Sequence, residues 1–122
     1  MRIVIQTVLH KAQRYPTAGD WQFSESDRVL TIAVSDTGDW RSNMLVAIHE
    51  LVEAICCAAA GIDQAEVDAF DMAHPELDEP GAHPDAPYHD QHSLAEGIER
   101  ILGNALGISW CEHEANIAGL DE

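Results

Sequence analysis

One apolar stretch of the chain contains three residues that can do acid–base or metal chemistry. Residues 44–61 read MLVAIHELVEAICCAAAG, and His49, Glu50 and Glu53 are the charged or polar interruptions of this run. On a helix, residues i and i+4 share a face, whereas neighbouring residues diverge by about 100°. We therefore expect His49 and Glu53 side by side, with Glu50 rotated away. Burying such groups costs free energy unless they are paired, and a metal ion would pair them.

A second polar cluster lies on the later helix that the pattern predicts between about residues 86 and 106. His92 and Glu96 are four residues apart, His89 is one turn earlier, and Glu99 follows. If the two helices share a core, the two clusters converge, with His92 as the third ligand and His89 and Glu96 as additional candidates. The apolar stripes expected to face the core are Met44, Ile48, Leu51, Val52, Ile55 and Ala59 on the first helix and Leu94, Ile98, Ile101, Leu102 and Ala105 on the second.

The predicted ligand set is His49, Glu53 and His92. Two imidazoles and one carboxylate suit zinc or another first-row divalent ion, and three protein ligands leave a position for water. Glu50, rotated away from the ligand pair, is then placed to act as a general base toward that water. The residues therefore predict a metal-dependent hydrolase with Zn²⁺ as the preferred cofactor.

The sequence HELVE at residues 49–53, followed by a ligand-bearing helix, resembles the active-site layout of the zincin metallopeptidases. The most similar layout is that of the minimal gluzincins, which consist of a short sheet, a motif helix and a second helix donating the third ligand. The resemblance implies peptide or amide substrates. Zincins of this type have His at the fifth motif position and Glu on the second helix, whereas here Glu53 and His92 exchange these places. The HExxE variant supports metal binding more than it supports peptide cleavage.

A broader pattern, from RYPTAGDW at residues 14–21 through HELVEA to APYHDQHSLAE, resembles small uncharacterised proteins of tailed bacteriophages and prophages. This resemblance covers most of the chain but implies no particular activity. It would place the protein in the cytoplasm of a bacterial host.

Local patterns predict a single α+β domain over residues 1–122. A short antiparallel sheet of about three strands comes first, and two main helices then pack on one face of it, as in a zincin. Turn residues and capping residues set the boundaries. The expected strands are residues 2–9, 21–23 and 29–35, and the expected helices are a main one from the Asp39–Ser42 cap to Ala60, a short one at residues 64–72, the main one described above and a terminal one after Ser109.

Composition restricts the class of partner. Six Lys and Arg residues against 22 Asp and Glu residues give a net charge of −16, so direct binding to a nucleic-acid backbone is not expected. An unknown peptide or protein is the expected partner. Neither a signal peptide nor a membrane span is expected, which predicts a cytoplasmic protein. The three cysteines lack a CxxC spacing and are expected to be reduced.

Two alternatives remain open from the sequence. Glu50, Glu53, Glu96 and Glu99 could form an all-carboxylate magnesium site, as in a nucleotide pyrophosphohydrolase. Alternatively, the chain is a non-catalytic, metal-stabilised acidic interaction protein, for example a nucleic-acid mimic. Three histidines outside the two clusters, His74, His83 and His113, are expected to be exposed in loop or terminal segments.

Overall fold

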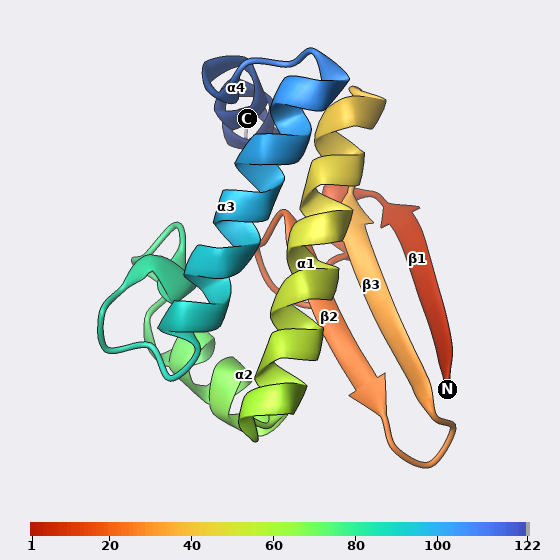
Figure 1. Cartoon of the computed structure of the whole chain (residues 1–122), viewed down its shortest axis with the longest axis vertical. Coiled ribbons are helices and arrows are strands. Elements are labelled where there is room, and N and C mark those ends of the chain that lie inside the picture. The colour runs from red at the N-terminus through yellow and green to blue at the C-terminus, as the bar shows by residue number, and fades with distance from the viewer. Residues whose placement is uncertain (122) are drawn as a thin grey trace.

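The strands form a mixed sheet at the start of the chain. The computed structural model describes residues 1–121. Its strands are β1 (Arg2–Val8), β2 (Gly19–Ser24) and β3 (Val29–Ser35), in the spatial order β1-β3-β2 (Figure 1). The hairpin of β2 and β3 is antiparallel, but β1 runs parallel to β3. The prediction of a wholly antiparallel sheet is therefore wrong for β1.

The apolar content of β3 explains why it occupies the centre of the sheet. Leu30, Ile32 and Val34 alternate along β3 and are almost completely buried. β1 offers Ile3 and Ile5 on the same face, yet both are more than 40% exposed. The strand with the most apolar surface to bury, β3, thus lies in the centre with a neighbouring strand on each side. The chain passes from β1 at one edge to β2 at the other edge and then returns to the centre as β3.

The main helix α1 (Trp40–Ala60) lies across one face of the sheet (Figure 1). Asp39 caps its N-terminus by accepting a hydrogen bond from the backbone N–H of Arg41. Gly61 ends it with a φ of 74°, a left-handed conformation that glycine adopts without strain. Both boundaries agree with the prediction because they depend on local capping chemistry.

The second main helix, α3 (His89–Leu106), packs along α1 (Figure 1). The α+β class is thus confirmed, with the sheet first and the helices after it. The terminal helix begins after Ser109 as predicted, and Ser109 caps it because its hydroxyl accepts from the N–H of Glu112. The remaining elements are η1 (His10–Ala12), α2 (Gln64–Ala73), η2 (Pro80–Ala82), α4 (Trp110–Ala118) and η3 (Gly119–Asp121).

The buried faces of both main helices differ from the predicted apolar stripes. On α1 the predicted members Met44 and Ile55 are exposed, and on α3 so are Leu94 and Ile101. The contact between α1 and α3 instead centres on charged and small residues. The buried residues are Ser42, Leu45, Val46, Ala47, His49, Glu53, Ala54 and Cys57 on α1 and His92, Ala95, Glu99 and Gly103 on α3.

Helix α1 is also, within residues 1–121, the one helix long and apolar enough to cross a membrane. In the structure it is packed against β2, β3 and α3, with His49 and Glu53 on its buried side. This placement is that of a core helix. The cysteines are free thiols, as predicted: Cys57 is buried, Cys56 is half-buried and Cys111 is exposed.

The contact between α1 and α3 should dominate stability. Leu45 is fully buried there, whereas Leu94 is 52% exposed on the outer face of α3. We expect Leu45→Ala to lower the free energy of unfolding by about 2–5 kcal/mol, because it leaves a cavity. The chemically identical change Leu94→Ala should alter it by less than about 0.5 kcal/mol. Urea unfolding of the two variants measures the difference, and equal losses would contradict the assigned faces.

Candidate metal centre

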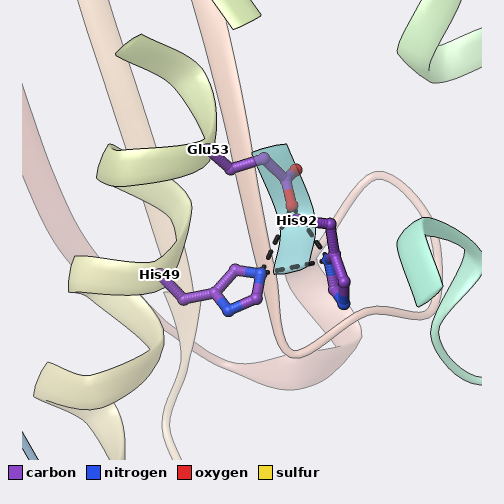
Figure 2. A group of neighbouring side chains, drawn as sticks. All are labelled: His49, Glu53 and His92. Carbon is purple, nitrogen blue, oxygen red and sulfur yellow. Dashed lines mark hydrogen bonds and ion pairs between the residues drawn. The ribbon is translucent and has the colours of Figure 1, made fainter. Parts of the chain in front are cut away.

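Three of the predicted residues meet at the contact between α1 and α3. Figure 2 shows His49 and Glu53 extending from one helix toward His92 on the other. His49 Nε2 lies 3.3 Å from Glu53 Oε2 and 3.3 Å from His92 Nδ1. His92 Nδ1 lies 3.1 Å from the same Glu53 oxygen. The three atoms form a nearly equilateral triangle, and each side chain is 10% exposed or less.

The size of this triangle matches one face of a zinc coordination tetrahedron. Ligand atoms that bind one zinc ion at about 2.0–2.1 Å stand roughly 3.3–3.4 Å apart in tetrahedral geometry. Within residues 1–121, His49, Glu53 and His92 are the group of His, Cys, Asp and Glu residues that offers such converging atoms. They can therefore hold a metal ion, with no need for a backbone movement to bring them together.

Each ligand of α1 is oriented by a partner on its other polar atom. The indole Nε1–H of Trp21 on β2 donates to Glu53 Oε1 at 3.2 Å, which leaves Oε2 for the site. His49 Nδ1–H donates to Glu99 Oε1 at 2.7 Å, which leaves Nε2 for the site. A carboxylate behind a metal-binding imidazole fixes the ring orientation and the tautomer.

The hydrogen bonds continue from Glu99 to the C-terminal helix. His113 Nε2 donates to Glu99 Oε2 at 2.5 Å, and its Nδ1 accepts from the Ser42 hydroxyl at 2.9 Å. Asn116 donates to the same hydroxyl oxygen. The prediction that His113 is exposed is wrong, because it is only 2% exposed. The short helix α4 turns this side chain inward, where it donates a hydrogen bond to a carboxylate that would otherwise be costly to bury.

Trp21 and His113 are the partners that sequence reasoning missed. Nothing in the sequence around Trp21 indicates a polar role, and His113 is expected from its terminal position to be exposed. They lie 32 and 14 residues from Glu53 and Glu99 in sequence. Helical spacing reveals pairs within one helix, such as His49 and Glu53, but nothing local marks a pair that joins two elements.

Imidazole and carboxylate groups alternate along this chain of hydrogen bonds, and their pairing sets the pKa values in the site. Burial alone would lower the pKa of His49, but hydrogen bonds to Glu53 and Glu99 outweigh it and raise the pKa to about 11. Burial would likewise raise the pKa of Glu53, but His49 and His92 lower it to about 2. The pKa of Glu99 is lowered by His113 and His49 against the same effect of burial. In the metal-free protein, His49 is therefore a cation held between two carboxylates.

Glu50 has the same side chain as Glu53 but differs from it in burial and in the direction of its pKa shift. It is half-buried and packs against the first residue of β2, since a Cβ on Gly19 would lie 2.7 Å from Glu50 Cγ. Burial and the charge of Glu53 raise its pKa well above the ordinary value. Perturbed carboxyl groups of this kind are typical of general acids and bases.

The two additional candidates on α3 lie outside the triangle. His89 Nδ1 is 3.0 Å from the backbone carbonyl oxygen of Gly81, so this side chain braces the preceding segment. Glu96 is half-buried and is not part of the converging group. Both oxygens of Glu99 face imidazoles, so the four carboxylates of the magnesium alternative do not meet as one cluster.

Comparison of the chain with protein-family models, with curated proteins and with solved structures finds no match in any of the three. The zincin and phage resemblances therefore stay predictions.

The charge state of His49 makes metal binding depend on pH. Because its pKa is about 11 in the metal-free protein, His49 must lose the Nε2 proton when a metal ion binds. Zinc affinity should thus rise by about tenfold per pH unit between about pH 6 and pH 8, with about one proton released per ion. Calorimetry in buffers of different ionisation enthalpy measures the released proton. An affinity independent of pH would contradict a protonated His49.

Proposed function

We propose that the protein is a zinc-dependent, zincin-like hydrolase whose metal ligands are His49, Glu53 and His92. The observation that carries this proposal is the triangle of ligand atoms with sides of 3.1–3.3 Å. Three protein ligands are typical of catalytic zinc sites, whereas structural zinc sites are usually closed by a fourth. Zinc is preferred to magnesium because two of the three ligand atoms are imidazole nitrogens.

The residues around the triangle have separable roles in this proposal. A bound zinc ion supplies Lewis-acid activation of water and of a carbonyl group. Glu53 and His49 are held in place by Trp21 and Glu99, so neither has to reorganise. Within residues 1–121, Glu50 makes no such hydrogen bond, and its pKa is raised. It is therefore suited to take a proton from the attacking water and to give it to the leaving group.

Peptide or amide bonds are the proposed substrates, on the basis of the HELVE resemblance alone. The cytoplasm of a bacterial host is the proposed location on the phage-like pattern alone. The acidic surface favours a basic peptide or protein over nucleic acid as the partner, because a net charge of −16 repels phosphate groups.

Burial of the triangle favours a second candidate, a metal site that stabilises the fold without catalysis. His49, Glu53 and His92 are all buried. Two shallow hollows, of about 250 and 560 Å³, are lined by other residues. A metal-stabilised interaction protein needs no access to the ion, whereas a hydrolase must admit substrate to it.

The two glutamates of the motif helix test the proposal. We expect about one zinc ion per wild-type chain. Glu53→Gln should weaken zinc binding and thermal stability together, because bound metal contributes folding free energy. Glu50→Gln should retain the metal. If the protein is a hydrolase, Glu50→Gln should lower turnover by roughly 100-fold or more. Elemental analysis, thermal unfolding with and without zinc, and peptidase assays provide the measurements.

The outcomes separate the candidates. Loss of metal in Glu50→Gln as severe as in Glu53→Gln would show that both carboxylates are ligands and would refute the assignment of Glu50 as the base. Zinc binding without any hydrolysis in the wild type would favour the structural candidate. If the wild-type protein neither binds zinc nor gains stability from it, both the hydrolase and the structural metal site are refuted.

A further inference from the structure

One ring nitrogen of His92 lacks a partner. Within residues 1–121, His92 Nε2 is the buried side-chain nitrogen or oxygen that makes no hydrogen bond. A buried polar atom without a partner costs roughly 1–3 kcal/mol, so such an atom calls for an explanation. The carboxylate that faces it is that of Glu79, whose Oε1 lies 4.0 Å away. That distance is too long for a hydrogen bond but requires only a small movement to become one.

The two nitrogens of His92 face different groups. Nδ1 faces His49 and Glu53, whereas Nε2 faces Glu79 across the opposite edge of the ring. Glu79 is therefore not placed as a fourth ligand. A metal ion on Nδ1 would require the lone pair there, which puts the ring proton of neutral His92 on Nε2. Metal binding thus creates a donor that points at Glu79.

The segment that carries Glu79 lies in close contact with the imidazole ring of His92. Gly81, two residues later, lies so close that a Cβ there would be 2.6 Å from His92 Cγ and Nδ1. The carbonyl oxygen of Gly81 is held by His89 Nδ1 at 3.0 Å. Glu79 itself is mostly exposed, so its side chain is free to move by the required distance while the backbone next to it is fixed.

We infer that Glu79 is the positioning residue for His92, accepting a hydrogen bond from Nε2–H when a metal ion occupies the triangle. This inference rests on the proposed metal site. It completes a symmetrical arrangement, because each ligand then has a partner on its outer polar atom: Trp21 for Glu53, Glu99 for His49 and Glu79 for His92. It also couples metal occupancy to the ordering of the segment around η2.

Zinc affinity of Glu79 variants, measured by competition with a chelator, tests this role. Glu79→Ala removes the acceptor and should weaken zinc binding by about tenfold or more, the range typical for a group behind a ligand. Glu79→Gln loses the same charge but keeps an amide oxygen that can accept from Nε2–H, so it should retain most of the affinity. Asp78→Ala, a neighbouring exposed carboxylate, is the control for the loss of one negative charge.

Hydrogen exchange supplies a second readout. Zinc should slow amide exchange in residues 74–88 in wild type and in Glu79→Gln, but less in Glu79→Ala. Equal zinc affinity in Glu79→Ala and Asp78→Ala would overturn the inference while leaving the metal site intact. Equal weakening in Glu79→Ala and Glu79→Gln would also overturn it, because the effect would then be one of charge. Failure of the wild type to bind zinc would instead refute the metal site itself.

Discussion

The structure depends on how it pairs five ionisable side chains between its helices. His49, Glu53, His92, Glu99 and His113 are all buried where α1, α3 and α4 meet. Charges taken out of water are tolerated only when their partners are close and well oriented. Here carboxylates and imidazoles alternate from Glu53 to His49, Glu99 and His113, and each carboxylate oxygen has a donor. Removing one member would leave a neighbour buried and unpaired, so the arrangement holds together as a unit.

This constraint explains why the helices present unexpected faces to each other. An apolar contact between α1 and α3 would use Ile55 and Leu94, yet both are about half exposed. Apolar packing tolerates many rotations of a helix because it is not directional, whereas hydrogen bonds between rings and carboxylates fix the rotation and the register. Two small residues of α3, Ala95 and Gly103, are buried together with this cluster. Because the polar contacts fix the rotation of the helices, Ile55, Leu94 and Ile101 remain exposed.

The residues that orient the candidate ligands are different from Glu50, the candidate general base. Trp21 and Glu99 each hold one atom of a ligand and leave the other atom for the site. Glu50 lies beside this framework without such a partner, and its pKa is raised by burial and by Glu53. In the proposed hydrolase, a set of ligands held by hydrogen bonds would lie next to a carboxyl group with a perturbed pKa, which is the arrangement expected of a hydrolytic site. The exposed side chain of Glu79 and the segment around η2 lie against the outer edge of His92.

The sequence alone determined the features that depend on neighbours along the chain. Asp39, Gly61 and Ser109 marked helix boundaries because capping is local, and the i, i+4 spacing of His49 and Glu53 placed them on one face. Only the tertiary structure decided the rest: the parallel pairing of β1, the buried faces of α1 and α3, and the inward position of His113. These features depend on contacts between residues far apart in sequence, and at the helices the free energy of pairing buried charges outweighs the local apolar pattern. The spacing of residues within one helix therefore cannot predict which face of that helix is buried.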